Sequence, residues 1–194
     1  MSGNAYVGEK MTKKDFLKNY WRNYLYLEER FLATGNYVSI EKENNDAFSF
    51  EYLSLFILLC NEIDSISTEF CNWIEKQKKN RNIGIKVDII KTIYPNLSNL
   101  RVITNGQFEG YNFVPFLKFD ENSAEWWKDY TYVKHYRSQK DEKTGKPNYY
   151  KANLKNVFTA LSALYLLSRL FFEKLDGNSS DAELISAVFN GYEG

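Results

Sequence analysis

The sequence holds one histidine, two cysteines and three prolines in 194 residues, and its formal net charge is zero. One histidine and two cysteines at this spacing do not make a zinc site. A chain without a basic excess is not attracted to nucleic acid over its whole surface, although a local basic patch stays open. The glycine-rich nucleotide loops GxGxxG and GxxxxGK[ST] and the nucleophile pattern GxSxG do not occur. We therefore expect no metal site and no cofactor.

The two cysteines, Cys60 and Cys71, fall on one predicted helix. Their separation along a helix is roughly 16 Å, which is too far for a disulfide between them. They are typical of buried thiols in a reducing compartment. The longest apolar region, residues 157–172, is shorter than the roughly 20 residues of a membrane span and contains Arg169. With no basic and apolar leader at the start, these features predict a cytoplasmic protein that does not cross a membrane.

Few prolines and glycines, together with an aromatic fraction of 17%, favour long regular elements around an aromatic core. Apolar residues recur at helical spacing in four long segments. These segments are residues 12–35, 48–78, 123–137 and 149–175. The pattern predicts a mostly α-helical bundle of four to five main helices in a single domain, residues 1–194, after a loose N-terminus at residues 1–11.

The last long segment is apolar nearly all round between residues 157 and 172. A helix of this kind lies either at the centre of a bundle or in a subunit interface. Because the segment holds more apolar surface than a few partner helices readily cover, we predict a two-fold homodimer. Its interface would bury part of residues 157–172 or the aromatic face near Trp126.

Shorter elements are expected between and after the long helices. Isoleucines four apart predict a short helix over residues 85–93, ended by Pro95, with a strand as the alternative. The segments LRVIT and YNFVPFLKF, joined by NGQFEG, predict a small β-hairpin insertion at residues 97–119. A short helix is expected over residues 181–189. Thr12 with Asp15 predicts a capping box, and Ser123 predicts a second N-cap.

An aspartate interrupts the apolar arc of the second long helix. On a helical wheel, Asp64 falls within that arc and Glu62 at its opposite margin. A carboxylate among apolar groups is costly unless a cation or a hydrogen-bond donor meets it. We predict that Asp64, or failing that Glu62, contacts Arg137 or His135 across the bundle. The alternative is that Asp64 lies at the wet edge of the helix.

The only histidine lies in the stretch WWKDYTYVKHYR, residues 126–137. On a helix, Lys128, Thr131 and His135 share a polar face, while Arg137 extends the aromatic face. Residues 128–155 carry eight lysines and arginines against three acids. Histidine exchanges protons near neutral pH, cations hold phosphates, and tyrosines and tryptophans stack on unpaired bases. These are the parts of a metal-independent ribonuclease; the alternative is a structural histidine, enclosed and hydrogen-bonded.

Three segments resemble the HEPN superfamily of all-α domains, over residues 48–78 and 123–172. They are SFEYLSLFILLCNEIDSI, WWKDYTYVKHYR and YYKANLKNVFTALSALYLL. The second is similar to a group of uncharacterised bacterial and phage proteins with the pattern Trp-x-x-Tyr-Asn-x-Val-Lys-His-x-Arg. The resemblance implies a four- or five-helix bundle, frequent dimers, and metal-independent RNase activity in toxin–antitoxin or phage-defence systems. The implied partners are RNA and an antitoxin or defence protein.

The catalytic pattern of that superfamily is an arginine, a polar residue, four to six further residues and a histidine. His135 matches the histidine, and Lys128 stands at the arginine position. Lysine lacks the bidentate guanidinium fork, and Thr131 replaces the asparagine of the closer group. The resemblance thus implies either catalysis by His135 and Lys128, or a non-catalytic interaction module in which His135 and Arg137 are structural. A third reading is a binder of anionic small molecules.

The candidate site residues fall into three roles. His135 and Lys128 are the candidate catalytic residues, the former for proton transfer. The candidate contacts to phosphate or RNA are Lys134, Arg137 and Lys151. The candidate supporting acids are Asp64 and Glu62.

Overall fold

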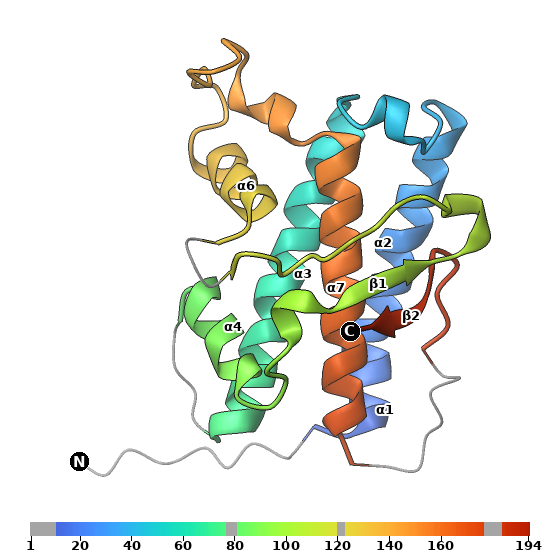
Figure 1. Ribbon diagram of the computed structural model, residues 1–194, viewed down its shortest axis with the longest axis vertical. Helices are drawn as coiled ribbons and strands as arrows, with labels where there is room; N and C mark the ends of the chain where they lie inside the picture. Colours follow the sequence, from blue (N-terminus) through green and yellow to red (C-terminus); the bar gives the residue numbers. More distant parts are fainter. Residues whose placement is uncertain (1–10, 77–80, 120–122, 177–183) are drawn as a thin grey trace.

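The computed structural model describes residues 11–76, 81–119, 123–176 and 184–194. Within these ranges the protein is mostly α-helical with one small two-stranded antiparallel sheet, which confirms the predicted fold class. Long helices stand side by side, and shorter helices and the sheet pack against them (Figure 1). None of the helices in these ranges combines the length and the apolar character needed to span a bilayer.

The first long rod consists of α1 (Lys13–Phe16), a π-helical turn (Leu17–Trp21) and α2 (Arg22–Ala33). The predicted capping box opens it. The backbone N–H of Asp15 donates to the Thr12 hydroxyl at 3.2 Å, and the Thr12 N–H donates to the Asp15 carboxylate at 3.1 Å. Both bonds satisfy backbone donors that the start of a helix leaves without intrahelical partners.

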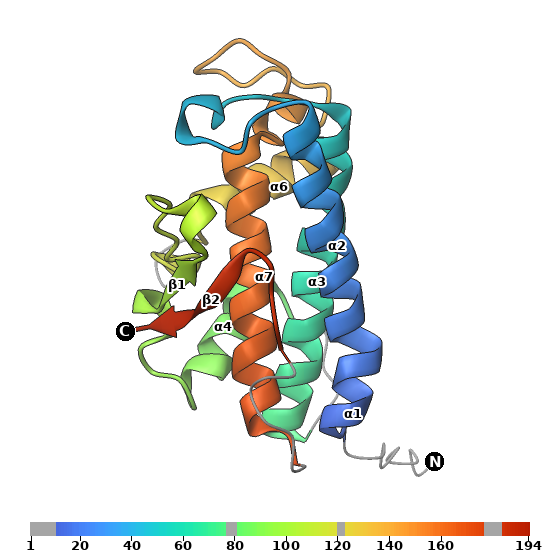
Figure 2. The ribbon, with the colours of Figure 1, turned by 90° about the vertical axis from the view of Figure 1, so that its right-hand side faces the viewer.

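Two further long helices run antiparallel to this rod (Figures 1 and 2). The helix α3 (Phe50–Glu75) is capped by Ser49, and α7 (Leu154–Lys174) is capped by Asn153. The start of α7 lies later than predicted, because a 3₁₀ turn (Asn148–Lys151) precedes it. Both caps accept a hydrogen bond from a backbone N–H of the first helical turn at 3.0 Å.

The helix α7 is enclosed by the rest of the chain. Every residue from 160 to 168 is buried. Figure 2 shows α2 and α3 on one side of α7 and the sheet on the other. The ring centroid of Phe158 lies 4.7 Å from that of Phe31 on α2 and 4.6 Å from that of Phe113. Because the chain itself covers residues 157–172, and Trp126 is buried as well, neither predicted dimer surface is open to a second copy.

Two shorter helices pack beside α3. The helix α4 (Ile83–Lys91) confirms the predicted short helix rather than the alternative strand. The helix α6 (Glu125–His135) lies nearer the start of α3, and its N-cap is Ala124 instead of Ser123, without a side-chain bond. Because α6 ends at His135, Arg137 lies in the following loop and does not extend the aromatic face as predicted.

The small sheet joins distant parts of the sequence. The strand β1 (Arg101–Thr104) pairs antiparallel with β2 (Phe189–Glu193). Within the predicted hairpin insertion, only Val102 and Phe113 form a bridge. The second strand therefore comes from the C-terminal segment, and residues 184–188 are not helical, contrary to the predicted short helix. The first three residues of that predicted helix lie outside the described ranges.

A buried carboxylate explains why residues 186–188 are not helical. Glu28 of α2 is 3% exposed and accepts hydrogen bonds from the Ala187 N–H at 3.0 Å and from the Ser186 hydroxyl. The Tyr24 hydroxyl donates to it at 2.7 Å. Burial, and then the nearby Glu28 charge, raise the pKa of Tyr24 well above its usual range, so Tyr24 stays a neutral donor. Backbone N–H groups that donate to Glu28 cannot also donate to the carbonyl groups of a helix.

We expect Glu28→Ala to lower the free energy of unfolding by about 3 kcal/mol, because it leaves several donors in the core without an acceptor. Glu29→Ala, at the neighbouring exposed position of α2, is the matched control and should change stability by less than about 0.5 kcal/mol. Urea unfolding measures both values. Hydrogen exchange at Ala187 and Val188 should accelerate in Glu28→Ala alone. Equal stability of the two variants would contradict the role of Glu28.

Candidate functional site

The helix α6 is two-sided, as its sequence predicts. The buried residues of α6 are Trp126, Trp127, Tyr130 and Val133. Two hydrogen bonds fix its orientation: the Trp126 indole donates to the Pro115 carbonyl at 2.8 Å, and the Tyr130 hydroxyl donates to Asn61 at 2.9 Å. The opposite side is exposed. We call the following residues the outer face of α6: Lys128, Thr131, Tyr132, His135 and Tyr136.

His135 is the last residue of α6 and its side chain is exposed. It forms no hydrogen bond or ion pair with the described residues, and its ring centroid lies 6.3 Å from that of Tyr136. A structural histidine would be enclosed with both ring nitrogens bonded. The structure instead places His135 in solvent, where a ligand can reach it.

The cations around His135 are exposed and have no ion-pair partner among the described residues: Lys128, Lys134 and Arg137. Lys134 lies with its ammonium 5.5 Å from the Tyr130 ring centroid. Lys128 shares the outer face with His135 but precedes it by seven residues, or about 10 Å along the helix axis. The predicted catalytic pair therefore shares a face without lying in contact.

Lys151 differs from the other predicted phosphate contacts because its ammonium already forms ion pairs with two carboxylates. Its ammonium lies 3.0 Å from Asp129 and 2.9 Å from Asp141. Burial disfavours the charged form, but hydrogen bonds to Asp141 and Asp129 outweigh it and raise the pKa of Lys151. The ammonium also lies 5.5 Å from the Tyr132 ring centroid. Lys151 thus joins the loop to α6 and supports one ring of the outer face.

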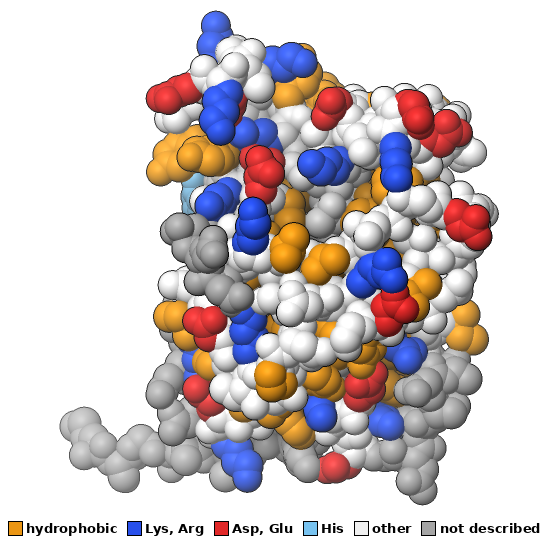
Figure 3. Space-filling view, in the orientation of Figure 1, with side chains coloured by type: hydrophobic (Ala, Val, Ile, Leu, Met, Phe, Trp, Pro, Cys, Tyr) orange, Lys and Arg blue, Asp and Glu red, His pale blue; other side chains and the backbone are white. Residues whose placement is uncertain are grey.

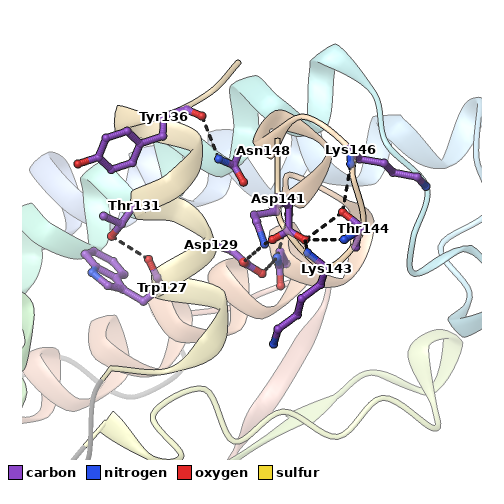
Figure 4. A network of polar contacts seen from close by, with 11 residues as sticks. Trp127, Asp129, Thr131, Tyr136, Asp141, Lys143, Thr144, Lys146 and Asn148 are labelled. Carbon is purple, nitrogen blue, oxygen red and sulfur yellow. Dashed lines mark hydrogen bonds and ion pairs between the residues drawn. The ribbon is translucent and has the colours of Figure 1, made fainter. Parts of the chain in front are cut away.

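The same network of ion pairs and hydrogen bonds around Asp141 holds the loop after α6 in place (Figure 4). The Asp141 carboxylate accepts from the backbone N–H groups of Lys143 at 3.1 Å and Thr144 at 2.9 Å. Lys151, and then Thr144, lower the pKa of Asp141 to about 2. The Asn148 side chain donates to the Tyr136 carbonyl at 3.0 Å. These bonds give the basic loop a fixed position beside α6.

The two predicted supporting acids lie elsewhere. Asp64 is exposed and its carboxylate lies 2.7 Å from the ammonium of Lys86 on α4. Glu62 forms no hydrogen bond or ion pair with the described residues. The predicted contact with Arg137 or His135 is therefore wrong, because α4 brings a cation to Asp64 from the other side. The sequence signal for this pair is Lys86 itself, a lysine within the apolar stripe of α4.

An open pocket of about 420 Å³ lies between the outer face of α6 and the start of α4. The residues of α6 and α4 that matter for its chemistry are Asn82, Gly84, Trp127, Lys128, Thr131 and Tyr132. Sequence reasoning found Lys128 and Thr131 but missed Asn82 and Gly84. No local pattern joins these segments, which only the packing of α4 and α6 beside α3 brings together.

Among the described residues, no group of three or more histidine, cysteine, aspartate or glutamate side chains is placed to hold a metal ion. Cys60 and Cys71 are free and buried, as predicted. Burial raises the pKa of both thiols, for Cys71 to about 11, so neither is a ready nucleophile at neutral pH.

We expect Asp64→Ala to lower the free energy of unfolding by about 1.5 kcal/mol, because the buried ammonium of Lys86 loses its carboxylate partner. Asp88→Ala, at an exposed position of α4, removes an aspartate that has no partner among the described residues and is the matched control. Thermal unfolding of both variants checks the difference. A shift in Asp64→Ala no larger than that in Asp88→Ala would show that the pair contributes nothing.

We expect the Asp141 carboxyl to titrate at about pH 2 in the folded protein, against an unfolded value of about 3.9. A lowered folded pKa means that its stabilising effect is complete above the unfolded pKa and is lost as the pH falls through about 2. Carbon-detected NMR of the carboxyl measures the midpoint. In Lys151→Met the midpoint should rise toward the ordinary value. An unchanged midpoint there would exclude Lys151 as the main cause.

Comparison of the chain with models of known protein families, with curated proteins and with solved structures gives no match. The HEPN resemblance of residues 48–78 and 123–172 therefore stays a prediction.

Proposed function

We propose that the protein binds single-stranded RNA on the outer face of α6. The observation that supports this most is the pair Tyr132 and Tyr136, each 47% exposed, with ring centroids 6.3 Å apart. Unpaired bases stack on exposed aromatic rings, and these two rings lie next to one another. Lys151 supports one of the two rings from within the protein.

The charges around these rings suit a phosphodiester chain. Lys128, Lys134 and Arg137 have no ion-pair partner among the described residues, so their charges are open to an anionic ligand. Figure 3 shows lysine and arginine side chains gathering over α6 and the loop that follows it, with acids between them. In a chain of zero net charge, such a patch confines RNA to one face rather than attracting it everywhere.

Cleavage of the bound RNA is the second part of the proposal, and the exposure of His135 supports it. The exposed imidazole can accept the proton of a 2′-hydroxyl as that oxygen attacks the adjacent phosphorus. The bond from phosphorus to the 5′-oxygen then breaks, which leaves a 2′,3′-cyclic phosphate on one fragment, and the leaving 5′-oxygen takes a proton from water or from the imidazolium. Lys134 directly precedes His135 in the sequence and Lys128 shares its face, so both can neutralise the phosphate on which charge develops. This chemistry is that of a metal-independent endoribonuclease. The alternative is a module that binds RNA without cleaving it.

The biological setting rests on the resemblance of residues 48–78 and 123–172 to HEPN-like proteins. We propose a role in a phage-defence or toxin–antitoxin system, with an antitoxin or defence protein as a partner. The buried free thiols Cys60 and Cys71 fit the reducing cytoplasm. A homodimer, if formed, would use a surface other than α7 or Trp126.

We expect Tyr132→Ala and Tyr136→Ala each to weaken binding of single-stranded RNA about tenfold, because a base stacked on an aromatic ring contributes about 1–3 kcal/mol. Tyr37→Ala removes a tyrosine that is 90% exposed outside this face and is the control. Fluorescence anisotropy with labelled RNA at fixed salt measures the affinity. Equal loss in all three variants, or no binding by the wild type, would contradict the proposal.

The same preparations decide between cleavage and binding alone. Incubated with the RNA in EDTA, the wild type should cleave it, and His135→Gln should bind with unchanged affinity but leave it intact. Wild-type protein that binds RNA and leaves it intact would identify the module that does not cleave.

A further inference from the structure

Among the residues that the structure describes, the lining of the pocket between α6 and α4 includes hydrogen-bond donors and one cation, Lys128, and contains no carboxylate. Lys128 lies on its α6 wall and has no ion-pair partner among the described residues. A lysine that is free of acids beside a concave surface favours an anionic ligand there.

Trp127 gives the pocket a second, independent feature. Trp127 is only 8% exposed as a residue, yet its indole N–H forms no hydrogen bond with the described residues. The neighbouring Trp126 spends its own N–H on the Pro115 carbonyl at 2.8 Å. Buried tryptophans usually find an acceptor for this donor. The indole nitrogen of Trp127 is not fully buried, and the residue lines the pocket. A ligand in the pocket can therefore accept the hydrogen bond from this N–H.

The opposite wall is the start of α4, which is nine residues long. Asn82 caps the helix by accepting from the Ile85 N–H at 3.0 Å. The N–H groups of the residues between them have no intrahelical acceptor, and the positive end of the helix dipole lies there. Gly84 keeps this wall open, because it has no side chain of its own. Among the described residues, a Cβ at this position would approach the Asn82 side-chain oxygen, at 3.4 Å.

We propose that this pocket binds the phosphate monoester of a nucleotide. The phosphate oxygens accept from Lys128, from the Trp127 indole and from the start of α4. A volume of about 420 Å³ admits a ligand of nucleotide size. Tyr132 lines the pocket and also belongs to the outer face, so the nucleotide's base can stack on its ring.

The phosphate monoester comes either from a free nucleotide or from the end of an RNA strand. The first source is independent of the proposed function. The second rests on it and deepens it, because the pocket adjoins the outer face through Tyr132: the protein would then select RNA by its phosphorylated end.

The test titrates the protein with AMP, with adenosine, and with short single-stranded RNA bearing a phosphate or a hydroxyl at either end. The Trp127 indole resonance in ¹H–¹⁵N NMR reports on the pocket and is assigned with Trp127→Phe. We expect AMP to shift this resonance and adenosine to leave it unchanged. RNA with a phosphate at one end should bind about tenfold more tightly than RNA with hydroxyl ends. Lys128→Gln should remove both effects. The control Lys18→Gln, which removes an exposed lysine of the π-helical turn that belongs neither to the pocket nor to the outer face of α6, should retain them.

The outcomes separate the two proposals. Binding of AMP at Trp127 without any RNA binding supports the pocket and overturns the RNA-binding face. A preference for phosphorylated ends without AMP binding assigns the pocket to RNA ends. Equal binding of all RNAs with no response to AMP overturns the pocket and leaves the RNA-binding face standing. Persistence of the AMP shift or of the end preference in Lys128→Gln would also overturn the assignment.

Discussion

The burial of α7 is the constraint on which the rest of the structure depends. A helix with apolar side chains on all sides is stable in water only when other elements surround it. The helices α2 and α3 cover one side, and the sheet with the segment before α6 covers the other (Figure 2). Aromatic rings make these contacts: Phe70 of α3 stacks on Phe171 at 4.5 Å, and Phe189 of β2 lies 5.0 Å from Tyr165.

The second side of α7 depends on a polar interaction rather than an apolar one. β2 lies over α7 because Glu28 holds the residues just before the strand. A buried carboxylate is tolerated only while donors surround it, so the C-terminal segment and α2 specify each other's position. The same segment supplies the strand partner of β1. One carboxylate thus links α2, the sheet and the cover of α7.

The outer face of α6 is a consequence of how that helix is anchored. Bonds from Trp126 and Tyr130 turn the aromatic side inward, so Tyr132 and His135 face solvent. The ion pairs of Lys151 with Asp129 and Asp141 then fix the basic loop beside α6. As a result, the charge of Lys151 is not open to a ligand. The fold therefore divides the charges of this region into a structural group and a group open to ligands.

The sequence alone predicted the helical class, the apolar character of residues 157–172 on all sides, and the polar face that His135 shares with Lys128, because helical periodicity is a local property. Whether the chain itself or a second copy covers residues 157–172 was decided only by the tertiary structure. The sequence could not predict pairings between distant segments, which depend on how helices pack. Asp64 pairs with Lys86 instead of Arg137, and β1 pairs with β2 instead of with the segment that follows it in the predicted hairpin. Lys151 forms ion pairs with Asp129 and Asp141. The pocket between α4 and α6 was likewise decided by the tertiary structure, since two helices far apart in sequence form its walls.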